Sequence, residues 1–136
     1  MKIHHIGIAV KSLAESVPFY RDALGLEVAS TEEVPSEGVR VAFLPAGEAR
    51  VELLEALGPE SPIARFVAKK GEGIHHVCFE VEDLEKSVAA LRRGGAEIIE
   101  PSIRVGAGGH RIAFVHPRST HGLLVELKEV KEGGSR

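Results

Sequence analysis

One histidine and one glutamate stand at matching positions in each half of this sequence. They are His5 and Glu52 in the first half, and His76 and Glu126 in the second. Imidazole nitrogens and carboxylate oxygens are common ligands of divalent metal ions, and two ionised glutamates would balance a +2 charge. The pattern therefore predicts a metal site that takes two ligands from each half.

The local patterns turn these side chains away from their apolar neighbours. Side chains alternate across a strand, so His5 shares a face with Gly7 and Ala9, and the branched residues between them share the other face. Glu52 and Glu126 likewise lie opposite the apolar residues beside them. A glutamate that faces inward must be paired, protonated or bound to a cation. One such residue alone is more often a hydrogen-bonded or solvated side chain, and its repetition in both halves is what favours a site.

The halves arose by tandem duplication. An offset of 71 residues places His5 on His76, together with apolar positions along both halves. Further on the offset is 74, which places Glu52 on Glu126, and a three-residue insertion within 116–122 accounts for the change. Matching positions that persist through most of both halves, with one short insertion, indicate two copies of one module.

Each copy has the same predicted order of elements, a strand, a helix and three more strands. Ser12 and Glu15 form a capping box before the first helix, and Pro18 is expected to kink that helix. Asp83 caps the second helix. The predicted strands are 3–10, 26–31, 38–44 and 49–55 in the first copy, and 74–81, 96–100, 110–115 and 122–129 in the second.

A further helix should join the copies. In the segment SPIARFVAKKG, Ser61 is a favourable N-cap, Pro62 suits the first helical position, and Gly71 follows the end. The elements together predict an α+β fold of tandem βαβββ modules, whose two four-stranded sheets either cover one another or form a curved, half-barrel mixed sheet around the metal site.

We expect a single domain over residues 1–130. Module one covers 1–57, the linker helix 58–72 and module two 73–130, and 131–136 is a flexible tail.

Composition excludes several classes of function. The net charge is -3 without a basic patch, so a nucleic-acid partner is not expected. No apolar run approaches the roughly 20 residues that cross a bilayer, and no signal peptide is expected. A lone cysteine, Cys78, predicts a cytoplasmic location. The absence of Asn and Gln, with 18 Glu among the 20 acidic residues, indicates a thermophilic source.

The chain resembles the vicinal oxygen chelate superfamily, and within it the methylmalonyl-CoA epimerases, over residues 2–129. The more specific signals are the linker helix SPIARF and the ending HPRSTHGLLVEL. The segments that carry the resemblance are HHIGIAVKSL, FYRDALGLEV, EGVRVAFLPAGEARVELLE, SPIARFVAKKGEGIHHVCFEVEDL and GAGGHRIAFVHPRSTHGLLVEL.

The resemblance implies a ligand set and a reaction. His5, Glu52, His76 and Glu126 match the family's metal ligands, with cobalt or manganese favoured and nickel, magnesium or zinc also acceptable. The implied reaction interconverts the 2R and 2S forms of methylmalonyl-CoA by proton abstraction at C2 through a metal-stabilised enolate. Glu126 and Glu52 are the expected proton carriers on the two faces of C2, although some epimerases carry glutamine at the position of Glu52. A homodimer and an acyl-CoA substrate are also implied.

Two alternatives share this fold. A glyoxalase I-like lactoylglutathione lyase would use the same His, Glu, His, Glu set for related enediolate chemistry. A non-catalytic small-molecule binding or resistance protein would often lack the ligands, and here all four positions are filled. An extradiol dioxygenase is expected to use three protein ligands, so the fourth argues against it.

Other polar residues are given lesser roles. His4 and His75 fall opposite His5 and His76 in the strand alternation, so we expect them at strand edges or on the surface. Arg104, His110 and Arg118 flank the site in this topology and are candidates for contacts with the CoA arm.

Overall fold

The computed structural model describes residues 1–130 and contains the βαβββ order twice. The chain divides into two compact units. The N-terminal unit is His5–His75, and the C-terminal unit is Met1–His4 with the described chain from His76 onward. The linker helix therefore groups with the first module. The predicted tail, 131–136, lies outside the described residues.

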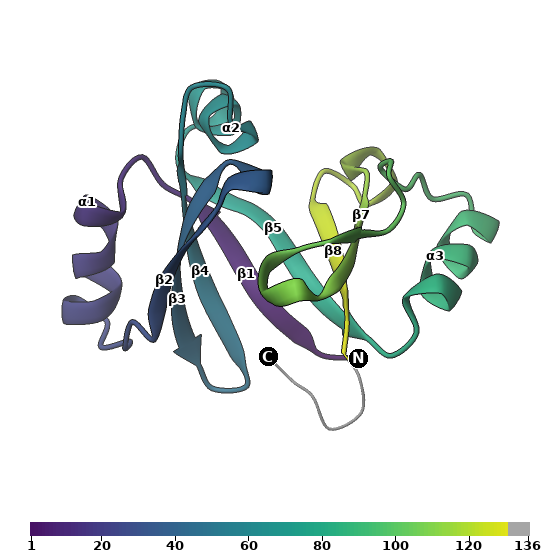
Figure 1. The fold of residues 1–136 in the computed structure, drawn as a ribbon, viewed down its shortest axis with the longest axis horizontal. Coiled ribbons are helices and arrows are strands. Elements are labelled where there is room, and N and C mark those ends of the chain that lie inside the picture. Colours follow the sequence, from purple (N-terminus) through teal and green to yellow (C-terminus); the bar gives the residue numbers. More distant parts are fainter. Residues whose placement is uncertain (131–136) are drawn as a thin grey trace. The chain divides into compact units, whose positions relative to one another are not determined.

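The sheet of the N-terminal unit has the strand order β2-β3-β4-β1 (Figure 1). Strand β4 runs antiparallel to β3 and parallel to β1, and β2 runs antiparallel to β3. The strands are β1 (Ile3–Ala9), β2 (Ser30–Val34), β3 (Val39–Ala46) and β4 (Ala49–Ala56).

Two helical segments of this unit begin as the sequence predicts. The Ser12 hydroxyl accepts the Glu15 N–H at the start of α1 (Leu13–Pro18), and the Ser61 hydroxyl accepts the Ile63 N–H at the start of α2 (Pro62–Lys70). The kink expected at Pro18 is a change of helix type, because α1 continues as the π-helical turn η1 (Phe19–Ala23). Proline lacks an N–H and crowds the preceding turn, which favours the wider turn.

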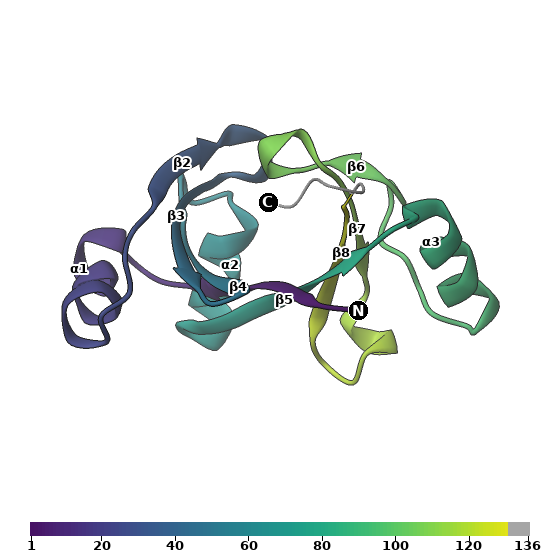
Figure 2. The same ribbon diagram turned by 90° about the horizontal axis from the view of Figure 1, so that it is seen from below.

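The two helices cover opposite faces of the N-terminal sheet (Figures 1 and 2). The α1 face packs Val10, Leu13, Ala42, Leu44 and Leu53. The α2 face packs Ala9, Val39, Val41, Phe43, Leu54 and Ile63. Alternation along β4 puts Glu52 on the same face as Leu54, so Glu52 lies on the face that α2 partly covers.

The sheet of the C-terminal unit repeats this arrangement in the order β5-β8-β7-β6. Strand β8 is parallel to β5 and antiparallel to β7, and the Lys2 carbonyl at the start of β1 accepts the Glu80 N–H at 2.9 Å. The strands are β5 (Gly73–Val81), β6 (Arg104–Val105), β7 (Arg111–Val115) and β8 (Leu124–Glu129).

Helix α3 (Leu84–Arg93) covers one face of this sheet (Figure 2). Asp83 caps its first turn by accepting the Lys86 N–H, and Gly94 follows its end. The core between helix and sheet consists of Val81, Leu84, Val88, Ile98, Ala113, Val115 and Leu127. The opposite face of the sheet carries His76 and Glu126 and has no helix of this unit upon it within the described residues.

Two predicted strands are wrong. The strand expected at 26–31 is β2 at Ser30–Val34, and Leu26 and Val28 instead pack from a loop onto the α1 core. The strand expected at 96–100 is reduced to a single bridge between Ile98 and Val115, and β6 comes later, at Arg104–Val105. Pro101 cannot donate a ladder hydrogen bond, which explains why pairing stops before it.

Within residues 1–130, none of the helices combines the length and the apolarity needed to cross a membrane.

Candidate active site

The first predicted pair lies inside the N-terminal unit. His5 Nδ1 is 3.2 Å from Glu52 Oε2, and the two side chains are only 6% and 8% exposed. Parallel pairing of β1 with β4 places Gly7 opposite Glu52. His5 is two residues before Gly7 on the same strand face, so its imidazole reaches the carboxylate across the strand pair.

Arg50 adds a second contact to this carboxylate. Its Nε donates to Glu52 Oε2 at 3.1 Å, and its guanidinium lies 4.8 Å from the centre of the Phe43 ring. Phe43 is the cross-strand partner of Glu52 in β3. Both contacts of Glu52 among the described residues therefore engage Oε2, which leaves Oε1 as the oxygen that could bind a metal ion.

The second predicted pair lies inside the C-terminal unit. His76 Nε2 is 3.2 Å from Glu126 Oε1, and each side chain is 10% exposed. Parallel pairing of β5 with β8 places Cys78 opposite Glu126. In both units, then, the histidine stands two residues before the strand partner of the glutamate. The duplication has preserved this geometry together with the residue types.

The structure thus brings the four predicted ligands together as two His–Glu pairs, one in each unit. Each pair offers a buried imidazole nitrogen beside a buried carboxylate, a donor set that divalent ions accept. Ligation of one ion by both pairs remains a prediction.

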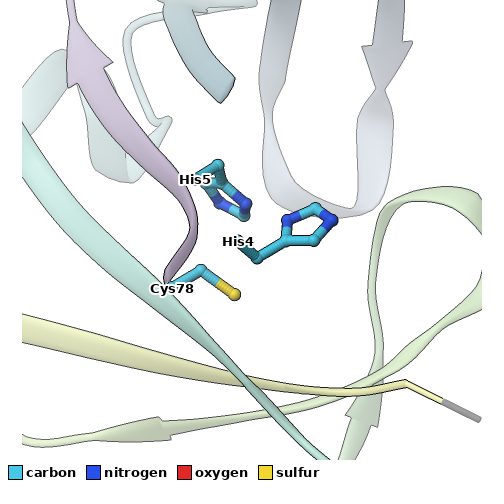
Figure 3. A group of neighbouring side chains, drawn as sticks. All are labelled: His4, His5 and Cys78. Carbon is cyan, nitrogen blue, oxygen red and sulfur yellow. The ribbon is translucent and has the colours of Figure 1, made fainter. Parts of the chain in front are cut away.

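His4 is not a surface residue, contrary to the sequence-based expectation. It is 5% exposed, and its Nε2 lies 3.2 Å from Nζ of Lys128, which is equally buried. A His4 nitrogen also lies within 4.8 Å of the Cys78 sulfur, and Figure 3 shows both side chains. The Lys2–Glu80 hydrogen bond explains this burial, because it holds this end of β1 beside β5.

His75, which was expected at a strand edge or on the surface, is half-buried. Its ring packs in a T-shaped arrangement against Phe66, with centroids 5.0 Å apart.

Lys128 was missed by the sequence reasoning, although a signal was present. The 74-residue offset that aligns Glu52 with Glu126 also aligns Leu54 with Lys128. A lysine in place of a core leucine, two residues after a candidate ligand and on the same strand face, marks a polar position on that face.

The two arginines predicted to contact a CoA arm differ in exposure and in their contacts. Arg118 has a 73% exposed side chain and pairs loosely with Glu97 at 3.7 Å. Arg104 is half-buried, and its guanidinium lies 5.2 Å from the centre of the Phe114 ring. Of the two arginines, Arg104 is therefore the one that contacts the sheet face of Glu126, because Phe114 is the cross-strand partner of Glu126.

Comparison with known proteins gives consistent relatives. The family model described as the Glyoxalase/Bleomycin resistance protein/Dioxygenase superfamily matches residues 4–114. An ethylmalonyl-CoA/methylmalonyl-CoA epimerase from Cereibacter sphaeroides is 40% identical, over 95% of this chain and 98% of its own. An uncharacterised protein of Bacillus subtilis is 42% identical, over 96% and 93% of the two chains.

Solved structures extend the likeness to the fold. A variant of the Streptomyces coelicolor methylmalonyl-CoA epimerase in complex with 2-nitronate-propionyl-CoA is 36% identical and superposes with a TM-score of 0.91, covering 100% of this chain and 98% of its own. These matches confirm the resemblance seen in the sequence: the chain belongs to the Glyoxalase/Bleomycin resistance protein/Dioxygenase superfamily and, within it, to the family of the methylmalonyl-CoA epimerases.

Proposed function

We propose that this protein is a metal-dependent epimerase that interconverts the 2R and 2S forms of methylmalonyl-CoA. The observation that carries the proposal is the pair of buried His–Glu contacts, His5 with Glu52 and His76 with Glu126, each at 3.2 Å. The epimerase names of its relatives and the acyl-CoA analogue bound to the Streptomyces enzyme support the reaction and the class of substrate.

The four residues fit a divalent ion by their chemistry. Each pair combines a neutral nitrogen ligand with an anionic oxygen ligand, and buried carboxylates need a positive partner. His5, Glu52, His76 and Glu126 would together hold the ion, and cobalt or manganese is the favoured metal. When bound, the ion would supply Lewis-acid stabilisation of the negative charge that develops next to C2.

The glutamates supply the proton transfer in this proposal. One carboxylate removes the proton at C2, and the other returns a proton to the opposite face, so that the configuration inverts without net change in composition. Glu126 is the first candidate for removal, and its Oε1 is the carboxylate atom that lies 3.2 Å from His76. Glu52 is the candidate for the opposite face, and Arg50 and His5 both contact its Oε2.

The test is incorporation of deuterium at C2 of methylmalonyl-CoA in D2O. We expect fast exchange with protein loaded with cobalt or manganese, and exchange at the protein-free rate after the metal is stripped by a chelator. Background exchange with folded, metal-loaded protein would refute the proposal. The hemithioacetal of methylglyoxal and glutathione serves as the comparison substrate, because turnover of it alone would identify the lactoylglutathione lyase reaction.

Cytoplasmic location, a homodimer and a thermophilic source remain part of this proposal as predictions. Gel filtration with light scattering would test the dimer, and a thermal melt would test the prediction of heat resistance.

A further inference from the structure

Arg104 places a guanidinium beside the candidate site of the C-terminal unit. It comes from β6, outside the strands that carry His76 and Glu126, and lies 5.2 Å from the centre of the Phe114 ring. Phe114 pairs directly with Glu126 across β7 and β8. Since neighbouring strands are about 4.8 Å apart, the cation lies within a few strand spacings of the reacting carboxylate.

One N–H group of Arg104 has no partner in the described structure. Its Nη2 donates to the Glu100 carbonyl at 3.2 Å and contacts the Pro101 carbonyl at 3.5 Å, which fixes the plane of the guanidinium. Its Nε is buried and makes no hydrogen bond within residues 1–130. A buried donor without an acceptor is rare in native proteins, because it gives up its hydrogen bonds to water without replacement. A ligand that supplied the acceptor would remove this cost.

The N-terminal unit shows which acceptor suits an arginine in this setting. There Arg50 also lies over a phenylalanine, Phe43, that pairs with a glutamate, and its Nε donates to Glu52 at 3.1 Å. Arg104 lies over a glutamate-paired phenylalanine in the same way, but it comes from β6 and not from the strand of the glutamate, and no carboxylate of the described residues accepts from its Nε. A carboxylate of a bound ligand is therefore a suitable acceptor for this N–H.

The loop after Arg104 is built for close approach. A Cβ added at Gly106 would lie 2.7 Å from the terminal methyl of Ile112 and 3.3 Å from two further carbons of that side chain, so a larger residue would make Ile112 shift. Ile112 is the strand partner of Arg104, so the loop packs closely on the strand pair that carries the guanidinium.

We infer that Arg104 binds the free carboxylate of the acyl group and selects carboxylated acyl-CoA substrates over uncharged ones. This inference rests on the proposed function. The diphosphate of CoA is a less suitable partner, because the pantetheine arm separates it from the reacting end of the substrate, whereas Arg104 lies over Phe114, the strand partner of Glu126. Arginine suits the role, since its planar fork matches the two oxygens of a carboxylate.

The experiment compares two ligands that differ in this carboxylate, methylmalonyl-CoA and propionyl-CoA, by calorimetric titration of the metal-loaded protein. The variants are Arg104→Gln and Arg104→Lys, and Arg93→Gln is the control, an exposed arginine in the last turn of α3. We expect Arg104→Gln to weaken methylmalonyl-CoA binding by roughly 10- to 100-fold, the range for hydrogen bonds to charged groups. Propionyl-CoA binding should change less than about twofold, and Arg93→Gln should change neither.

Two results would overturn the inference. Equal weakening of both ligands would place Arg104 on the shared CoA portion, and no weakening of either would remove it from the site. Arg104→Lys keeps a positive charge and an apolar stem against Phe114, so it gives the answer if the glutamine variant does not fold; we expect an intermediate loss for methylmalonyl-CoA alone.

The same titrations separate this inference from the proposed function. Wild-type protein that binds methylmalonyl-CoA more tightly than propionyl-CoA, and loses the preference in Arg104→Gln, supports the carboxylate site even if C2 exchange is absent. Wild-type protein that catalyses exchange and keeps the preference in Arg104→Gln refutes the Arg104 role alone.

Discussion

The His–Glu pairs of the two units share one strand geometry and differ in what surrounds the carboxylate. In the N-terminal unit, Arg50 comes from the same strand as Glu52 and donates to it. In the C-terminal unit, Arg104 comes from β6, lies over Phe114 and leaves its Nε without a protein acceptor. Strand pairing fixes the ligands in both copies, because a one-residue slip would turn every side chain to the other face. Strand register does not fix the neighbouring arginines in this way, and the two copies differ in where their arginine comes from and what it contacts.

A second difference lies two residues after each glutamate, at the equivalent positions Leu54 and Lys128. Leu54 is 5% exposed and packs in the core that α2 covers, whereas the equivalent Lys128 lies against His4. The linker helix serves only one unit, because it occurs once between the two copies. The copies therefore differ on this face: in one, α2 partly covers an apolar core, and in the other a buried lysine stands two residues after the glutamate.

The largest predicted effect tests whether the two glutamates are equivalent. Glu126→Gln should lower C2 deuterium exchange by about a thousandfold, within the range for loss of a general base. Glu52→Gln should cost less exchange, because Glu126 can still remove the C2 proton from its own face, while the amide oxygen at position 52 can still accept from Arg50. The measurement is the exchange rate at saturating substrate, with bound metal counted for each variant. Equal losses of exchange in the two variants, at equal metal content, would show that the two carboxylates have equivalent roles. The two units would then not differ in function.

A smaller effect is expected from removing the cation that distinguishes the N-terminal pair. Arg50→Gln leaves Glu52 held by His5 alone, so the carboxylate should be less well oriented as a ligand. Loss of a group that orients a metal ligand typically lowers metal affinity by about 10- to 100-fold. Competition with a chelator of known affinity measures this directly. Arg93→Gln is the matched control, and an unchanged affinity in Arg50→Gln would show that the Arg50 contact does not orient the ligand.

The sequence predicted the strand faces of the candidate ligands better than their surroundings, for a physical reason. His5, Glu52, His76 and Glu126 were singled out because duplication repeats a residue type at a strand position, and strand alternation then decides its face. Long cationic side chains reach several ångströms from their own backbone. Neither the alternation of residues along a strand nor the alignment of the two copies therefore shows what these side chains contact. The roles of Arg50 in holding Glu52 and of Lys128 beside His4 became visible only with the side chains placed.

The strand errors have a related cause. Leu26 and Val28 do alternate with polar residues, as in a strand, but they lie in a loop and pack onto the α1 core. Alternation alone does not distinguish a strand from such a loop. In the second copy, the bridge at Ile98 begins a strand that Pro101 prevents from continuing. Local signals placed the helices well, since caps such as Ser61 and Asp83 act within one turn.

The smallest predicted effect is on thermal stability, at the equivalent positions Leu54 and Lys128. Lys128→Leu restores the residue of the other copy, and replacing a buried charged group by an apolar one of similar size is often neutral or stabilising, here by about 1 kcal/mol. The expected rise in Tm is roughly 3–5 °C for a chain of this size. Thermal melts of metal-free protein measure it without any contribution from ligand binding.

The reciprocal change, Leu54→Lys, provides the matched control. It places an ammonium group in the core beneath α2, and a buried charge without a prepared partner should cost about 3 kcal/mol or more. A large loss in Leu54→Lys with little change in Lys128→Leu would show that the apolar residue suits both copies and that the lysine is kept for a reason other than stability. A loss of several degrees in Lys128→Leu would instead make the Lys128–His4 contact a structural one. The lysine would then be kept because it packs against His4 within the C-terminal unit, and the chemical difference between the two faces would be a consequence of folding.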